Sequence, residues 1–186
     1  MAWVKICGLT RPQDAEKAIE EGADALGFVM EFSSRRCIQD ADFEWILALP
    51  SPPERYAVYG PYDPDFDAPM KLIQSSDFVQ IGQIFTYRMG RPTIIPDEVG
   101  YVLLEPYVEG QHGGTGQLVD WDQAAEFVQN TNHKVILAGG LTPDNVAAAI
   151  AKVKPFGVDV SSGVEISPGL KDHGKIRAFI QAARGL

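Results

Sequence analysis

Short apolar runs alternate with amphipathic stretches along almost the whole chain. The apolar runs are rich in Val, Ile, Leu and Ala and suit strands buried on both faces, whereas the amphipathic stretches place their apolar residues on one helical face. We therefore expect strands separated mostly by helices. The expected strands cover residues 3–7, 25–30, 55–60, 78–81, 93–95, 101–105, 135–138 and 156–160, and the expected helices cover residues 12–21, 40–49, 68–75 and 121–129, a segment from 142 onward, and 172–184.

Eight strands alternating with helices favour a closed parallel (β/α)8 TIM barrel, with residues 1–186 as a single domain. Only residues 82–100 separate the fourth expected strand from the sixth, which is too few for a strand and two crossover helices. We therefore expect the helices after strands four and five to be largely missing. Phe78, Phe85 and Ile94 would then lack an outer cover, so we expect this flank to form a homodimer with a second copy.

The charge of the chain excludes several classes of partner. The 186 residues carry a formal net charge of −9 and contain no basic run, so nucleic acid and anionic membranes are poor partners. No apolar stretch reaches the length of a membrane span, and the two cysteines, Cys7 and Cys37, are too few for a disulfide framework. We expect a cytoplasmic protein that holds any anionic ligand through local contacts.

The expected strands at residues 135–138 and 156–160 are each followed at once by a loop that leaves backbone N–H groups free. Adjacent loops of this kind form a cradle for one phosphate group, since amides, hydroxyls and helix N-termini all favour a dianion. This pattern is the strongest functional signal in the chain. The expected phosphate-binding residues are Gly139, Gly140, Ser161, Ser162 and Gly163.

Functional groups of a TIM barrel lie where strands end and loops begin, and this position selects Cys7 and Glu105. A thiolate at Cys7 could act as a base if nearby positive charge lowered its pKa, although a buried core cysteine fits about equally well. Glu105 could donate a proton if burial raised its pKa, or it could be a solvated residue at the strand end. Arg35 and Arg36 could bind a carboxylate, or both could face solvent.

The remaining residues with reactive or metal-binding side chains are scattered. His112, His133 and His173 lack the spacing of metal ligands, so no metal site is expected. Cys37 does not lie at a strand end and is most simply structural. Residues 113–116, with the sequence Gly-Gly-Thr-Gly, form either a flexible connection or a lid over the site.

Several motifs occur in an order that is more informative than any one of them alone. They are Lys5–Thr10 (KICGLT), Gly22–Phe28 (GADALGF), Ser34–Arg36 (SRR), Val135–Leu141 (VILAGGL), Val158–Glu165 (VDVSSGVE), Pro168-Gly169 and Lys171-Asp172. In this order they resemble the phosphoribosylanthranilate isomerase family. The resemblance covers both ends of the chain and is weaker through the middle.

The resemblance implies a ribulose-phosphate-binding TIM barrel that catalyses an Amadori rearrangement in tryptophan biosynthesis without a cofactor. N-(5-phosphoribosyl)anthranilate would become 1-(2-carboxyphenylamino)-1-deoxyribulose 5-phosphate by general acid–base catalysis. By resemblance, Cys7 is the base, Glu105 is the acid, Arg36 holds the anthranilate carboxylate, Asp159 lines the sugar, and Gly140, Ser161, Ser162 and Gly163 hold the phosphate.

The chain departs from the family pattern at the acid, at the end of strand four and in its shortened middle. The family has aspartate in a Leu-Leu-Asp pattern where this chain has Glu105, and the extra methylene moves the carboxyl by roughly 1 Å, which can cost on the order of a hundredfold in rate. Its Gln-Leu-His-Gly pattern is Gln80-Ile81-Gly82-Gln83 here, without the histidine. Two alternatives therefore stay open: a divergent paralogue that binds a phosphorylated ligand without this activity, and an aldose–ketose isomerase for another ribosyl phosphate, which would not need Arg36.

Overall fold

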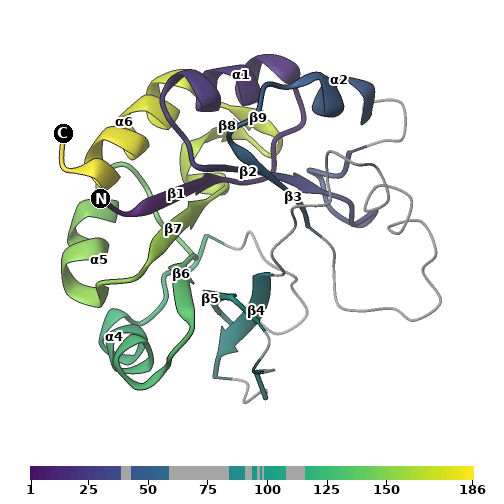
Figure 1. Cartoon of the computed structure of the whole chain (residues 1–186). Coiled ribbons are helices and arrows are strands. Elements are labelled where there is room, and N and C mark those ends of the chain that lie inside the picture. The colour runs from purple at the N-terminus through teal and green to yellow at the C-terminus, as the bar shows by residue number, and fades with distance from the viewer. Residues whose placement is uncertain (39–42, 59–83, 91–93, 96, 98, 108–115) are drawn as a thin grey trace.

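The computed structural model describes residues 1–38, 43–58, 84–90, 94–95, 97, 99–107 and 116–186. Seven parallel strands form one curled sheet in the order β3-β2-β1-β7-β6-β5-β4 (Figure 1). Strand β1, the first in the chain, pairs with β7, the last strand of this sheet in the chain. This neighbourhood of first and last strands is the one that a barrel requires. The strands are β1 (Trp3–Ile6), β2 (Ala25–Val29), β3 (Glu54–Val58), β4 (Ile84–Met89), β5 (Tyr101–Pro106), β6 (Lys134–Leu137) and β7 (Gly157–Val160).

Helices cover the outer face of this sheet, and neighbouring helices in that layer contact each other (Figure 1). Their apolar faces and the outward side chains of the strands form one buried core, as amphipathic segments between strands predict. The seven described strands and the helices outside them form a TIM-barrel-type fold, as expected. The described helices are α1 (Pro12–Glu20), α2 (Phe43–Ala48), α4 (Trp121–Asn130), α5 (Val146–Val153) and α6 (His173–Arg184).

Strands β1 and β7 alternate between apolar and polar side chains, and this alternation brings charged groups inside the barrel. Ile6 and Val158 are fully buried in the core between sheet and helices. Lys5 and Asp159 lie on the opposite face of the same two strands and bind each other. Because successive side chains of a strand point to opposite faces, Cys7 shares the inner face with Lys5.

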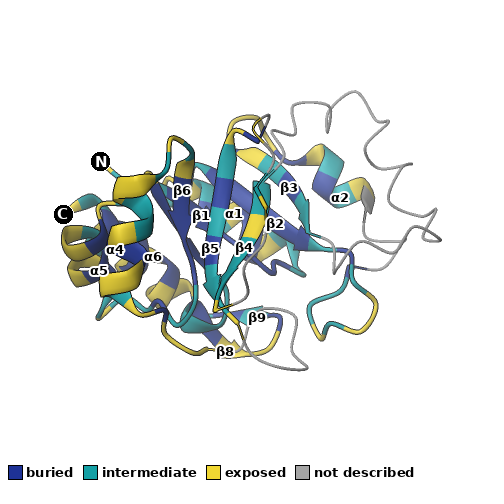
Figure 2. Cartoon of the chain, turned by 90° about the horizontal axis from the view of Figure 1, so that it is seen from below, coloured by how far each residue is buried: buried dark blue, intermediate teal, exposed yellow. Residues whose placement is uncertain are grey.

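Strand β4 is where the sequence prediction was wrong. A strand was expected at residues 93–95, but Ile94 and Ile95 form no strand, whereas Ile84–Met89 pairs with β5 along its whole length. The segment is half-exposed and contains Thr86 and Arg88, so it lacks the apolar run of a doubly buried strand (Figure 2). Its strand conformation comes from pairing with β5 and not from its own pattern.

The connection from β4 to β5 has no helix among its described residues, 90, 94–95, 97 and 99–100, as the expected shortening required. The strand expected at 78–81 and the helix expected at 68–75 lie outside the described residues, as does the sequence Gln80–Gln83. None of the helices in the described part of the chain combines the length and apolar character needed to cross a membrane.

A small antiparallel hairpin between β7 and α6 was not expected from the sequence. A 3-10 turn (Ser162–Val164) follows β7 and leads into β8 (Glu165–Ser167), which pairs with β9 (Leu170–Lys171). The pairing sets Glu165 opposite Lys171. Two charged residues are thereby brought next to the carboxyl ends of β1 and β7, where the loops of the barrel form the site.

Candidate active site

The loops that follow β6 and β7 lie against each other. A Cβ atom added to Gly163 would collide with the carbonyl oxygen of Leu141, so only glycine allows this approach of the two backbones. Gly139 and Gly140 have positive φ angles of 87° and 62°. A Cβ atom on Gly140 would lie 2.9 Å from the carbonyl oxygen of Gly116. These glycines let three stretches of backbone converge at one point.

Asn145, which the sequence analysis did not single out, fixes the loop after β6. Its side-chain amide donates to the carbonyl oxygen of Gly140 at 3.0 Å, and its side-chain oxygen accepts from the backbone N–H of Thr142 at 2.8 Å. The residue is also the N-cap of α5, which begins at Val146 and not directly after the Thr142-Pro143 pair. The only sequence signal for this role is an asparagine just before a helix.

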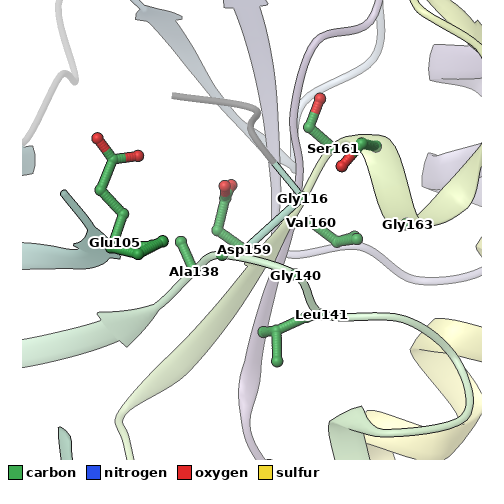
Figure 3. Close-up of a pocket in the computed structure, with 12 residues that line it drawn as sticks. Glu105, Gly116, Ala138, Gly140, Leu141, Asp159, Val160, Ser161 and Gly163 are labelled. Carbon is green, nitrogen blue, oxygen red and sulfur yellow. The ribbon is translucent and has the colours of Figure 1, made fainter. Parts of the chain in front are cut away.

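A small pocket of about 50 Å³ opens between these loops (Figure 3). In the close-up, Glu105 from β5 and Asp159 from β7 direct their carboxylates toward the same side of the pocket, and Ser161 lies on the far side of Asp159 from Glu105. Carboxylates, a hydroxyl and loop amides thus surround one space. The lining residues predicted from the sequence are Glu105, Gly139, Gly140, Asp159, Ser161, Ser162 and Gly163.

Cys7 and Arg36 are the two predicted site residues that do not line this pocket. Both lie beside it: Gly8, which follows Cys7 in the chain, is packed between the side chains of Arg36 and of Ser161, a residue that lines the pocket. A Cβ atom added to Gly8 would lie 2.5 Å from Arg36 Cδ and 2.7 Å from Ser161 Oγ. The residue after Cys7 is therefore enclosed by the arginine and by the serine loop, and its φ of 71° also favours glycine.

Cys7 is buried beside a cation. Lys5 Nζ donates to Asp159 Oδ1 at 2.7 Å, and its positive charge acts on the Cys7 thiol. Burial raises the pKa of the Cys7 thiol, while the positive charges of Lys5 and Lys171 oppose this rise. Burial alone would lower the pKa of Lys5, but Asp159 and Cys7 outweigh it and raise that pKa above its ordinary value. Lys5 is therefore a fixed positive charge at the thiol.

Glu105 is held by an arginine from the neighbouring strand. Arg88 Nε donates to Glu105 Oε1 at 2.8 Å, and both side chains are mostly buried. The two residues face each other in the register of β4 and β5. Arg88 was missed because its strand was missed, and an arginine in a half-polar segment gave no other signal.

Arg36 makes a two-point contact with Glu165. Its Nε and Nη2 atoms donate to the two carboxylate oxygens of Glu165 at 2.8 and 2.7 Å. Hydrogen bonding from Arg36 and the charge of Lys171 overcome burial and lower the pKa of Glu165. The same contact raises the pKa of Arg36. A planar fork on a carboxylate fixes the direction of the guanidinium as well as its position.

Lys171 completes this group and is almost fully buried, with 1% of its surface exposed. Its Nζ atom lies 2.6 Å from the carbonyl oxygen of Cys7, 2.8 Å from Glu165 Oε1 and 3.1 Å from the carbonyl oxygen of Ser161. Glu165 and Lys171 belong to motifs that the sequence analysis noted, but no pattern there indicated a role for either residue.

Among the described residues, no group of three or more His, Cys, Asp and Glu side chains is arranged to hold a metal ion. The arrangement instead offers acids, a thiol and fixed cations around a space lined by backbone amides. Such a set of groups can bind a phosphate monoester and move protons on the attached sugar.

Comparison with known proteins identifies the family. Residues 96–182 match the family model described as N-(5'phosphoribosyl)anthranilate (PRA) isomerase. The chain is 40% identical to the N-(5'-phosphoribosyl)anthranilate isomerase of Geobacter sp. (strain M21), with all of both chains covered. It is also 40% identical to the enzyme of that name from Pseudomonas fluorescens (strain Pf0-1), with 97% of each chain covered.

Solved structures agree with the sequence comparison. Phosphoribosyl anthranilate isomerase from Thermotoga maritima superposes with a TM-score of 0.78 at 31% identity, with both chains covered completely. A phosphoribosyl anthranilate isomerase in complex with reduced 1-(o-carboxyphenylamino)-1-deoxyribulose 5-phosphate superposes with a TM-score of 0.75 at 30% identity, also over both complete chains. This chain belongs to the N-(5'-phosphoribosyl)anthranilate isomerase family.

Proposed function

We propose that Cys7 and Glu105 carry the proton transfers of the reaction catalysed by this chain. The reaction is the Amadori rearrangement of N-(5-phosphoribosyl)anthranilate to 1-(2-carboxyphenylamino)-1-deoxyribulose 5-phosphate, a step of tryptophan biosynthesis. The observation that carries the proposal is the convergence of Glu105, Asp159 and the two phosphate-type loops on one pocket, with Cys7 beside it.

The chemistry needs one acid and one base. Glu105 donates a proton to the furanose ring oxygen, the bond between that oxygen and C1′ breaks, and an imine forms between C1′ and the anthranilate nitrogen. Cys7 then removes the proton from C2′, and the electron pair of that C–H bond forms the double bond of an enolamine. Tautomerisation delivers a proton to C1′ and leaves a ketone at C2′. Because C2′ is oxidised while C1′ is reduced, the steps balance without a redox cofactor.

The positions of the two groups support these roles. Glu105 is on β5 and Cys7 follows β1, so β6 and β7 lie between them in the sheet. Inward-facing side chains on separated strands of a curled sheet lie across the barrel from each other. A pentose held between them would present its ring oxygen to the acid and its C2′ proton to the base.

The remaining predicted residues bind the substrate in this proposal. Gly139, Gly140, Ser161, Ser162 and Gly163 hold the phosphate through backbone amides and hydroxyls, and Asp159 lines the sugar. Arg36 binds the anthranilate carboxylate. A guanidinium carries five N–H donors, of which the Glu165 carboxylate accepts two, so Glu165 can aim Arg36 without using its full capacity.

We also propose that residues 1–186 act as one domain in the cytoplasm and form a homodimer through β4 and the connection that follows it. A solved relative from Thermotoga maritima, 29% identical, is a dimeric enzyme studied as mutually generated monomers. Strand β4 lies at one edge of the described sheet, and Ile94, which follows it in the chain, is 91% exposed. Sedimentation of wild type and Ile94→Glu tests this. A wild type that stays monomeric at high concentration would exclude the dimer.

Complementation of a tryptophan auxotroph that lacks this isomerase tests the catalytic roles. Wild type is expected to restore growth, while Cys7→Ala and Glu105→Gln fail and Cys37→Ala, the matched cysteine control, succeeds. Growth of either active-site variant at the wild-type rate would reject its assigned role. If wild type fails but the purified protein binds the reduced product analogue, the chain is a phosphate-ligand binder without this activity.

A further inference from the structure

Lys171 is a buried cation to which neither the family motifs nor the proposed mechanism assigns a role. It lies on β9, in the hairpin that leads from the loop after β7 to α6. A buried lysine is costly to desolvate, so its retention here requires compensating contacts. Those contacts come from three separate parts of the site.

The contacts of Nζ favour the protonated form of Lys171. The nearest atoms to Nζ are the carbonyl oxygens of Cys7 and Ser161 and one carboxylate oxygen of Glu165, and all three accept hydrogen bonds. Burial lowers the pKa of Lys171, and Glu165 opposes this shift. A neutral amine has only two N–H donors and would turn its lone pair toward one of the three oxygens. The geometry therefore fits the ammonium form, which has three donors.

Each contact of Lys171 belongs to a different working part of the site. Cys7 follows β1 and carries the proposed base, and Ser161 begins the proposed phosphate loop. Glu165 holds Arg36 through two hydrogen bonds and also accepts from the backbone N–H of Gly169 at 3.2 Å. One ammonium group therefore joins the residue after β1 to the loop and hairpin after β7, more than 150 residues further along the chain.

We propose that Lys171 is a positioning residue that fixes the distance between the phosphate loop and Cys7, and that Glu165 extends this fixed unit to Arg36. The inference rests on the roles proposed above for Cys7 and Ser161. Covalent bonds set the distance from the phosphate of the substrate to its C2′ atom. Protein groups that bind the phosphate and remove the C2′ proton must therefore keep a matching distance, since a displacement of roughly 1 Å can cost on the order of a hundredfold in rate.

The ammonium also contributes charge where the chain needs it. Arg36, Glu165 and Lys171 together carry a net charge of +1 inside a chain whose formal net charge is −9. Lys5 and Asp159 form a direct ion pair at 2.7 Å and neutralise each other. The excess positive charge near Cys7 therefore comes from Arg36, Glu165 and Lys171 taken together. The charged groups that face Cys7 are Lys5, Asp159, Lys171 and Arg36.

Lys171→Met tests the inference, because methionine keeps most of the side-chain length and removes the ammonium. The matched control is Lys175→Met: Lys175 is exposed, and its Nζ donates to the backbone carbonyl of Glu165 at 3.0 Å. For Lys171→Met we expect kcat to fall on the order of a hundredfold with a smaller change in KM. The control should keep both constants within about twofold of wild type.

A second measurement does not depend on turnover. Ultraviolet absorbance of the thiolate, taken as the difference from a Cys7→Ala partner, follows the ionisation of Cys7 directly. Cys7 in Lys171→Met should ionise at higher pH than in wild type, because a cation facing the thiol is gone. This shift tests the link between Lys171 and Cys7 even if Cys7→Ala keeps isomerase activity, a result that would reject only the proposed base.

A folded Lys171→Met protein with wild-type kcat and an unchanged Cys7 titration overturns the proposal. A loss confined to KM overturns it as well, since that result would assign Lys171 to phosphate binding alone. If Lys171→Met does not fold by circular dichroism, Glu165→Gln replaces it, because this change keeps the side-chain size and removes the charge that Arg36 and Lys171 share. The expected result is then a loss of at least about tenfold in kcat, and wild-type kcat in that variant rejects the proposal.

Discussion

Arg88 and Glu105 face each other on adjacent strands and are joined by a 2.8 Å hydrogen bond between Nε and Oε1. Glu105 occupies the position at which the family pattern suggests an aspartate, so its carboxylate extends one methylene further from the strand. The Arg88 contact fixes this longer side chain at its end. A glutamate held at both ends has a defined carboxylate position, which an acid catalyst requires.

Glu105→Gln removes the proposed acid while keeping the shape of the side chain. We expect kcat to fall by on the order of a hundredfold or more, with little change in KM, because the amide cannot donate a proton to the ring oxygen in the same way. Steady-state kinetics measure both constants. Glu126→Gln on the exposed face of α4 is the matched control and should behave as wild type. Retention of more than a tenth of wild-type kcat in Glu105→Gln would assign the acid to another group.

Lys5→Met should move the ionisation of Cys7 to higher pH. Burial already raises the pKa of Cys7, and Lys5 is the first of the cations that oppose this rise. A base must be deprotonated to act, so kcat/KM is expected to increase with pH through the pKa of Cys7 and to do so later in the variant. The pH profile of kcat/KM and the thiolate absorbance report this shift. If the two proteins gave the same pH profile, Lys5 would have no influence on the pKa of Cys7.

Gly140→Ala should weaken phosphate binding through a steric clash. The added Cβ atom would lie 2.9 Å from the carbonyl oxygen of Gly116, so the loops must separate. We expect KM to rise by at least about tenfold, equivalent to about 1.4 kcal/mol. Gly90→Ala is the control, because Gly90 also has a positive φ but has nothing within 4 Å of an added Cβ. It should lose only about 1–2 kcal/mol of stability and keep its KM. Equal KM values in the two variants would contradict the crowding argument.

Asp14→Ala should destabilise the fold in a pH-dependent way. The buried Asp14 carboxylate accepts from Arg11, His173 and the backbone N–H of Lys171. Burial would raise the pKa of Asp14, but hydrogen bonds from Arg11 and His173 outweigh it and lower that pKa. A lowered carboxylate pKa contributes stability above the unfolded value of about 3.9 and loses it as pH falls through the folded value.

Urea unfolding at neutral and acidic pH measures this effect. The loss of stability in Asp14→Ala is expected to be on the order of 1–3 kcal/mol near neutral pH and to shrink as the solution is acidified. Glu16→Ala, an exposed carboxylate on the same helix, should change stability little at either pH. A loss for Asp14→Ala that is the same at both pH values would show that its charge is not the cause.

The elements with a clear hydrophobic period were predictable from the sequence, and β4 was not. Runs such as Val135–Ala138 are buried on both faces, so composition alone identifies the strand. Ile84–Met89 contains polar residues and is half-exposed, and its conformation depends on in-register pairing with β5. Sequence pattern cannot express a preference that arises from a partner strand.

The site divides in the same way. Glycines and serines after buried strands have a local pattern, and the structure does bring those loops together around one pocket. Lys171 and Glu165 have no such local pattern, because an isolated charged residue in a sequence normally indicates a solvent-exposed position. Arg36 and Glu165 are 129 residues apart in sequence. Only the folded structure reveals that Arg36, Glu165 and Lys171 contact one another beside the site.

The chain is negatively charged overall, but Arg36, Glu165 and Lys171 place a net positive charge next to the site. This arrangement determines how the rate of substrate capture depends on ionic strength. At physiological salt, charges further apart than about 8 Å are largely screened, whereas contacts at the proposed phosphate site, beside buried Lys171, would be much less affected. Added salt therefore weakens the long-range repulsion of an approaching dianion more than it weakens the final contacts. Capture of the substrate should become faster as salt is added, which is the reverse of the behaviour of a protein that attracts anions with a basic surface.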